Sequence, residues 1–311
     1  MTQTEEPKIW RFAPIILSLS LFILAVWAIS QEFKHYTFAQ LLASLDHLTT
    51  SRKLEAIFWM ALGYLSMTGY DRLGFYYINH PLALGTIIRA AFISYALGNT
   101  IGLTLFSGTA IRYRFYTPAG VGVVDIAKVI TFTHLSFWLG MLGIGGLSFL
   151  LDPQRIPQLL KLPFLTTKPL GIIFLLLVTG YFFLTLTYKK PIRIGQENIY
   201  LPSWTLSLAL ILLTFIDWIL AARVLYLLLP GSYNTSFLGF FGLYVFAMTA
   251  GVLSNVPGGI GVFEFIMLRL RPEYVSNAEL LGSLIAYRAI YYFLPLIVAF
   301  VWLLGYEARR K

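Results

Sequence analysis

Four ionisable side chains lie inside stretches that are otherwise apolar enough to cross a lipid bilayer. They are Asp71, Arg89, Asp217 and Arg288. A charge in the hydrocarbon core costs about 2.5 kcal/mol or more even on the most permissive scale. Such residues face the interior of a helix bundle or a water-filled cavity, and they pair with one another or mark a substrate path. The pattern therefore indicates a polar path through a membrane protein.

The first of two interrupted segments, Ser107 to Phe115, combines Gly108 with Arg112 and Arg114 in the string SGTAIRYRF. Glycine lets another backbone approach closely, and guanidinium groups suit two-pronged contacts with phosphate. If the segment is extended, both arginines face the same side. The string predicts a phosphate-binding segment, with a basic surface loop as the alternative.

The second interrupted segment, Ser254 to Glu264, contains residues that stop a helix: Pro257, Gly258, Gly259 and Gly261. Proline and glycine favour a break there. Backbone amides at the start of the next helix are suited to bind an anion. We expect Glu264 to cap that helix or to pair with an arginine. A tight loop between two membrane spans is the alternative.

The embedded charges need partners. Asp71 requires a cation or several hydrogen-bond donors if it is buried. The adjacent Arg72 points about 100° away on a helix, so a remote arginine is the better partner. Asp217 lies near the middle of an apolar run, and Arg288 is similarly embedded. An Asp217–Arg288 pair is one hypothesis, and a purely structural role for both residues stays open.

The composition excludes an ordinary soluble domain. The chain has 311 residues, of which 58% are hydrophobic and 12% are charged, about half the usual charged fraction. The net charge of +9 comes mainly from residues beside apolar stretches, so anionic lipid headgroups are the expected counter-charge and nucleic acid is not a predicted partner. Cysteine is absent and the four histidines show no metal spacing. We predict no metal site, no catalytic residue set and no cofactor.

A transmembrane helix needs about 20 apolar residues, which predicts an all-α, polytopic bundle of about eight spans with two re-entrant segments. The predicted spans are 13–30, 56–78, 83–106, 125–150, 169–188, 204–229, 236–253 and 278–305. The distribution of lysine and arginine favours both termini in the cytoplasm.

The two interruptions fall at corresponding places in the chain. We predict one transmembrane domain, 1–311, with two related halves at roughly 1–150 and 151–311. Paired interruptions in corresponding positions of two halves point to a transporter binding site. We therefore expect both segments to enter and leave the membrane on one face.

Five strings carry a resemblance to a known family: GYDR (69–72), GTAIRYR (108–114), DWILAA (217–222), VPGGIGVFE (256–264) and RAIYYFLP (288–295). With these, the sequence resembles the lysylphosphatidylglycerol synthase transmembrane family, the flippase module of multiple peptide resistance factor proteins. The resemblance implies a multi-pass protein of the bacterial plasma membrane that moves phospholipid between leaflets.

By the same resemblance, Asp71, Arg112, Asp217 and Arg288 match polar cavity positions of that module. Arg114 and Glu264, from the two interrupted segments, are further expected substrate-binding residues. The chain ends at Lys311 without a soluble aminoacyl-transferase domain, so it looks like a stand-alone member and synthase activity is not expected. The expected partner is membrane phospholipid. An accessory subunit of a lipid-modifying enzyme, such an enzyme itself, and a homodimer remain alternatives.

Overall fold

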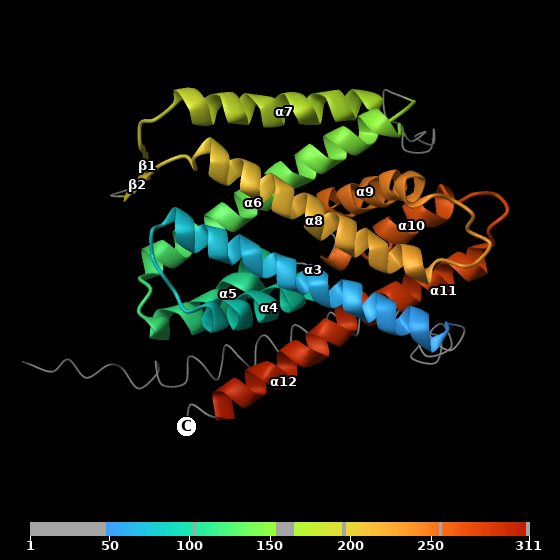
Figure 1. Ribbon diagram of the computed structural model, residues 1–311, viewed down its shortest axis with the longest axis horizontal. Coiled ribbons are helices and arrows are strands. Elements are labelled where there is room, and N and C mark those ends of the chain that lie inside the picture. Colours follow the sequence, from blue (N-terminus) through green and yellow to red (C-terminus); the bar gives the residue numbers. More distant parts are fainter. Residues whose placement is uncertain (1–47, 102–103, 154–164, 195–196, 255–256, 309–311) are drawn as a thin grey trace, which may run out of the picture.

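The computed structural model describes residues 48–101, 104–153, 165–194, 197–254 and 257–308 (Figure 1). These residues form a bundle of helices with one small hairpin of strands. The predicted first span, 13–30, lies outside the described residues. The prediction of a helical fold is confirmed for the part that is described.

The first half of the bundle contains long helices on either side of two shorter ones. In chain order these are α3 (Thr50–Tyr77), α4 (Leu84–Ile101), α5 (Thr104–Tyr116) and α6 (Val123–Leu151), with a short 3₁₀ turn, η1 (Thr117–Ala119), after α5. The side-chain hydroxyl of Thr49 accepts a hydrogen bond from the Arg52 amide and so caps the start of α3, which satisfies one of the free donors at a helix end.

Helix α7 (Lys168–Thr187) and a two-stranded hairpin connect the halves. Strands β1 (Ile192–Ile194) and β2 (Glu197–Ile199) are antiparallel, with Arg193 opposite Asn198. Much of α7 is exposed apolar surface. Figure 1 shows this helix at one edge of the bundle, so its outer face is available to lipid.

The second half again places short helices between long ones. These are α8 (Trp204–Leu228), α9 (Phe237–Leu253), the 3₁₀ turn η3 (Pro257–Gly259), α10 (Val262–Arg269), α11 (Asn277–Tyr287), the π-helical segment η4 (Arg288–Phe293) and α12 (Leu294–Ala308). Serine hydroxyls cap α8, α9 and α11 from Ser203, Ser236 and Ser276. The order long helix, short pair, long helix thus occurs twice, and the predicted relation between the halves stays a prediction.

Small residues set how closely the long helices pack. Helices α3 and α8 lie side by side in the centre (Figure 1), with Gly69 of α3 against Leu213 of α8. Helix α6 crosses α8 where Gly140 faces Thr214. It also meets α7 where the backbones of Gly146 and Gly171 approach each other. Packing of small residues is a principal source of helix association inside a bilayer.

Four of the predicted spans coincide with helices that are long and apolar enough to cross a membrane: Val123–Leu151, Lys168–Thr187, Trp204–Leu228 and the continuous run Asn277–Ala308. The predicted span 56–78 corresponds to α3, and 236–253 to the shorter apolar helix α9. Span 83–106 is not one straight helix, because α4 and α5 pack against each other and the Ser94 hydroxyl of α4 donates to the Gly108 carbonyl of α5. The total of eight spans stays a prediction.

The first interrupted segment differs from the prediction. Gly108 does not break the chain, because it lies within helix α5. It instead lets α5 pack closely on α4: a Cβ atom at Gly108 would lie 3.7 Å from the Ser94 carbonyl oxygen. The Ser94 hydroxyl donates to the Gly108 carbonyl at 3.2 Å. The glycine is therefore a packing residue within a pair of short helices.

The second interruption is confirmed as a helix break. Gly258, Gly259 and Gly261 have φ angles of 60°, 65° and 81°, a left-handed conformation that side chains with a Cβ rarely adopt. The turn also brings the two short-helix pairs together, since a Cβ at Gly258 would lie 3.4 Å from the Thr100 carbonyl oxygen at the end of α4. That both helix pairs are re-entrant in a bilayer stays a prediction.

Replacing Gly140 with alanine should destabilise the fold. An added Cβ would lie 2.2 Å from Thr214 Cβ, so α6 and α8 must separate, and overpacking of this kind costs about 1–3 kcal/mol. Thermal unfolding in detergent would measure the loss. The control is Gly180→Ala on α7, where a Cβ meets nothing within 4 Å. Equal unfolding temperatures for the two variants would contradict this account of the helix contact.

Candidate functional site: two buried arginine–carboxylate pairs

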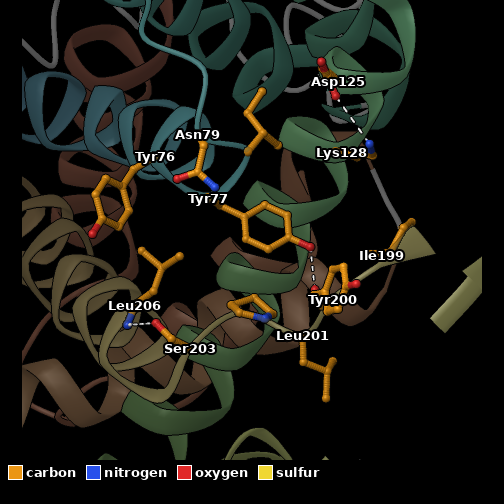
Figure 2. Close-up of a pocket in the computed structure, with 12 residues that line it drawn as sticks. Tyr76, Tyr77, Asn79, Asp125, Lys128, Ile199, Tyr200, Leu201, Ser203 and Leu206 are labelled. Carbon is orange, nitrogen blue, oxygen red and sulfur yellow. Dashed lines mark hydrogen bonds and ion pairs between the residues drawn. The ribbon is translucent and has the colours of Figure 1, made fainter. Parts of the chain in front are cut away.

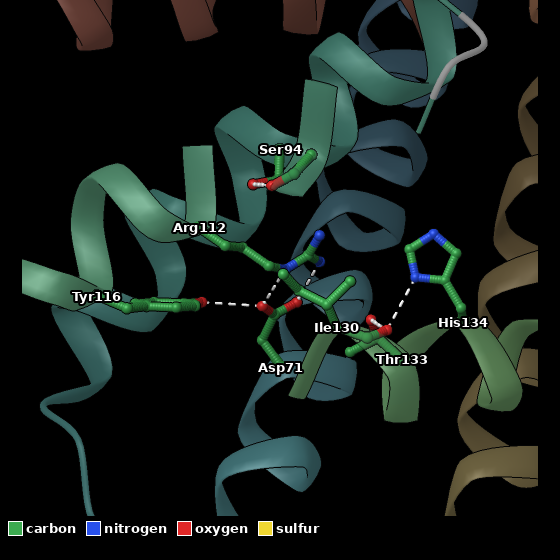
Figure 3. Close-up of polar contacts among 8 residues, drawn as sticks. Asp71, Ser94, Arg112, Tyr116, Ile130, Thr133 and His134 are labelled. Atoms are coloured by element: carbon green, nitrogen blue, oxygen red, sulfur yellow. Dashed lines mark hydrogen bonds and ion pairs between the residues drawn. The ribbon is translucent and has the colours of Figure 1, made fainter. Parts of the chain in front are cut away.

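Asp71 and Arg112 form a two-pronged ion pair in the interior (Figure 3). Arg112 Nε donates to Asp71 Oδ1 at 2.6 Å, and its Nη2 donates to Oδ2 at 2.7 Å. The Tyr116 hydroxyl also donates to Oδ1, at 2.9 Å. Asp71 is 0% exposed and Arg112 is 2% exposed. The predicted remote arginine partner of Asp71 is therefore Arg112, which joins long helix α3 to short helix α5.

An aromatic ring completes the environment of Arg112. The guanidinium carbon lies 5.0 Å from the centroid of the Tyr95 ring on α4. Because a guanidinium group is planar and weakly hydrated, it can make two hydrogen bonds and a ring contact at once. Two helices thus hold the cation carried by α5: α3 through the ion pair and α4 through the ring contact.

The second pair joins Glu264 on α10 to Arg288, where α11 passes into the π-helical segment. Arg288 Nε and Nη2 both lie close to Glu264 Oε1, at 2.9 and 2.8 Å. Nη1 donates to the Gly258 carbonyl at 2.8 Å. The Tyr292 ring centroid lies 4.6 Å from the guanidinium carbon. Both charged residues are buried, at 4% and 2% exposure.

Glu264 both caps α10 and pairs with an arginine, the two roles that the sequence predicts as alternatives. Its Oε2 accepts a hydrogen bond from the Gly261 amide at 2.8 Å, which caps the start of α10, while Oε1 holds Arg288. The glycine turn, the short helix and the long helix are therefore connected through one carboxylate. The sequence predicts that backbone amides of this turn bind an anion. In the structure, the Gly258 carbonyl of the turn accepts a hydrogen bond from Arg288.

A π-helical segment begins at Arg288, and such segments occur frequently at functional sites. Pro295 has no N–H, so it cannot donate to the carbonyl of Tyr291 four residues earlier. The Tyr64 hydroxyl donates to that carbonyl instead, at 3.1 Å. The irregular helix is thus supported from α3, the same helix that carries Asp71.

Asp217 takes part in neither pair. The proposed Asp217–Arg288 pair is wrong, because Glu264 occupies the guanidinium group of Arg288. Asp217 accepts a hydrogen bond at Oδ2 from the Tyr70 hydroxyl at 3.2 Å. Tyr70 is next to Asp71 in the chain, and its ring centroid lies 6.1 Å from that of Tyr95. Asp217 is therefore joined to the surroundings of the first pair through tyrosines.

Arg114 points away from Arg112. It pairs with Glu307 near the end of α12, at 2.9 and 2.6 Å. The expectation that Arg112 and Arg114 share one side assumed an extended segment, whereas a helix turns about 100° per residue and separates them. Sequence reasoning also missed the buried tyrosines as site residues, because aromatic side chains suit apolar cores equally well.

A separate pocket of about 430 Å³ opens where α3 ends and α6 and α8 begin (Figure 2). Tyr76, Tyr77, Asn79, Tyr200 and Ser203 contribute to its wall. Lys128 lies at one side and pairs with Asp125 at 3.4 Å and Glu197 at 3.1 Å. The pocket does not include any of the predicted site residues. Within the described ranges, no group of three or more His, Asp or Glu side chains is placed to hold a metal ion.

These features fit the family that the strings suggest. The sequence profile of the lysylphosphatidylglycerol synthase TM region matches residues 15–299, which is most of the chain. The protein belongs to this family. With four apolar helices of spanning length in the described part of the chain and this family assignment, it is an integral membrane protein.

Three proteins are similar in sequence to this chain along most of its length. Uncharacterized protein slr0712 of Synechocystis is 44% identical, over 94% of this chain and 91% of that protein. Inner membrane protein YbhN of Escherichia coli is 28% identical, over 97% of this chain and 95% of its own length. A phosphatidylglycerol lysyltransferase of Staphylococcus aureus is 24% identical over 97% of this chain, but the match covers 35% of that enzyme.

Removing one partner of the first pair should cost more than removing both. Arg112→Gln leaves the buried Asp71 carboxylate without its cation, which costs about 3–5 kcal/mol, and adding Asp71→Asn should restore part of that stability. Thermal unfolding in detergent gives both values. Arg223→Gln is the control, because its 3.5 Å pair with Glu55 is partly exposed and is worth about 1 kcal/mol or less. Purely additive losses would contradict the coupling.

Proposed function

We propose that this protein is a phospholipid translocase that moves an anionic or aminoacylated phospholipid between the leaflets of the bacterial plasma membrane. The observation that carries the proposal is the pair of arginines, each 2% exposed and each held by a carboxylate on another helix. Arginine is well suited to bind phosphate with two parallel hydrogen bonds. A phospholipid phosphate is an anion that must cross about 30 Å of hydrocarbon.

The proposed step is an exchange of anions on the arginine. In the closed arrangement Asp71 neutralises Arg112, and Glu264 neutralises Arg288. When a headgroup enters, its phosphate replaces the carboxylate on the guanidinium group. The released carboxylate then accepts hydrogen bonds from headgroup hydroxyls or pairs with a headgroup ammonium. Each arginine thus keeps an anionic partner throughout, which avoids the cost of an unpaired charge in a low-dielectric site.

The short helices are the elements that we expect to move. Arg112 lies on α5 and Glu264 on α10, and the ends of the two helix pairs approach each other where Gly258 meets the Thr100 carbonyl. Transporter sites commonly lie near the membrane midplane between interrupted helices of two halves. The proposal includes eight spans, two re-entrant helix pairs and both termini in the cytoplasm.

The relatives support a lipid substrate. The Staphylococcus aureus relative is named for phosphatidylglycerol, an anionic phospholipid, and this chain matches about a third of its length. That name also favours a second candidate function, in which this protein is part of, or assists, a lipid-modifying enzyme. Mass spectrometry of lipids from proteoliposomes supplied with aminoacyl donors separates the two functions, because only the enzyme changes the mass of the lipid.

Translocation should depend on the buried pair even when folding does not. The double variant Asp71→Asn with Arg112→Gln is charge-neutral and leaves no unpaired ion, but it cannot bind phosphate with a guanidinium group. In proteoliposomes with headgroup-labelled phosphatidylglycerol, wild-type protein should move label between leaflets, and the double variant should lose at least about tenfold in rate, roughly 1.4 kcal/mol of barrier.

The control for this assay is Arg223→Gln, outside the proposed path, which should move lipid at the parent rate. Circular dichroism and size exclusion must show that the double variant is folded. A folded double variant that translocates every tested phospholipid at the wild-type rate would refute the role of this pair in transport.

A further inference from the structure

Asp217 is a buried acid for which the described part of the chain supplies no neutralising cation. It lies near the middle of α8 and is 7% exposed. The Tyr70 hydroxyl donates to Oδ2, and no described residue donates a hydrogen bond to Oδ1. Among the residues that the structure describes, no lysine or arginine forms an ion pair with Asp217. Asp71, in contrast, holds Arg112 and accepts from Tyr116.

The titratable groups that the structure describes around Asp217 are neutral. The titratable side chains that interact with it electrostatically are all tyrosines from α3, α4, α9 and η4: Tyr64, Tyr70, Tyr95, Tyr244 and Tyr291. From α6, Phe137 packs on the neighbouring Trp218 and Gly140 packs on Thr214. On α7, the hydroxyl of Tyr181 forms a hydrogen bond with Ser207, which lies near the start of α8 and not beside Asp217. The Arg112 guanidinium lies over the Tyr95 ring, beyond Tyr70 in this set of contacts, and it is already held by Asp71.

An ionised carboxylate in such a place is costly, because one neutral hydroxyl cannot replace the water that a carboxylate loses. Binding a proton removes the charge at the site and leaves a small polar group. A carboxyl group that is neutral when enclosed and ionised when hydrated is a common means of carrying protons through membrane transporters.

We infer that Asp217 is the proton-binding residue of a proton-coupled transport cycle. In the enclosed arrangement Oδ1 carries the proton. When the bundle opens to water the O–H bond breaks, the proton passes to water, and the carboxylate is hydrated until a proton from the other side rebinds it. No covalent bond of the lipid changes. The coupling rests on the proposed translocation, whereas the proton on Asp217 can be tested without it.

Infrared difference spectroscopy tests the proton directly. Spectra of the full chain in proteoliposomes, from about pH 5 to about pH 9, should contain a pH-dependent band of a protonated carboxyl group at neutral pH. The band should vanish in Asp217→Asn, reappear at a different frequency in Asp217→Glu, and remain in the control Asp125→Asn at the start of α6. A carboxyl band of the same size in wild type and Asp217→Asn would overturn the assignment.

Transport tests the coupling. With an imposed pH gradient, wild-type translocation should change by up to about tenfold per pH unit, since one proton is bound, and a pH-sensitive dye should record proton movement that requires transported lipid. Asp217→Asn has the shape of the neutral acid, so it should fold with an unchanged unfolding temperature and lose the response to the gradient. Asp217→Glu should recover it.

The two proposals fail in different ways. The proton-binding role would be overturned if Asp217→Asn responded to the pH gradient as strongly as wild type. It would also be overturned if Asp217→Asn unfolded and Asp217→Glu showed no carboxyl band. If wild-type protein moves no lipid, the proposed translocation fails and the coupling fails with it, while the infrared band would still identify Asp217 as a proton-binding group.

Discussion

The constraint on which the structure depends is that a guanidinium group inside a membrane bundle must keep an anionic partner. Arg112 pairs with Asp71, 41 residues earlier in the chain, and Arg288 pairs with Glu264, 24 residues earlier. Each pair therefore connects a long helix to a short one. A pair of this kind contributes little net stability compared with an apolar core, yet breaking it is expensive. The helices that carry the charges are therefore held in one arrangement until another anion can take the place of the carboxylate.

The same constraint separates three buried acids of the described bundle by role. Asp71 and Glu264 are occupied by arginines, and Glu264 also caps α10 through the Gly261 amide. Among the described residues, Asp217 accepts a hydrogen bond from a tyrosine hydroxyl alone. Within one bundle, two acids are therefore suited to exchange partners with a headgroup, and the third is suited to exchange a proton. Close packing of α3, α6 and α8 around glycines is consistent with the proposal that the short helices, rather than these long ones, move during transport.

The sequence predicts which residues are buried and polar better than it predicts their partners. Asp71, Arg112, Asp217, Glu264 and Arg288 are all buried, because their apolar surroundings in the sequence leave few other places for them. Arg89, predicted to be embedded as well, is half-buried and donates to the Gly85 carbonyl of its own helix. Apolar surroundings do not predict the partner of Arg288, because Asp217 and Glu264 are both acids in apolar surroundings. The glycine turn brings Glu264 within reach of Arg288, and this geometry is not evident from the sequence. The break at Gly258 follows from proline and three glycines, whereas a single glycine at Gly108 is compatible with either a break or a close helix contact. The tyrosines around Asp217 have no signal that distinguishes them from core aromatics.

The most direct test of the central claim is whether the buried arginine meets lipid phosphate. Solid-state NMR of protein with ¹⁵N-labelled arginine in phosphatidylglycerol bilayers detects dipolar coupling between guanidinium nitrogen and lipid phosphorus. The account predicts a phosphorus-dependent signal in wild-type protein that is lost in the folded Asp71→Asn, Arg112→Gln variant and retained in Arg223→Gln. A phosphorus-dependent signal of the same size with and without Arg112 would show that lipid phosphate does not reach this residue and would contradict the account.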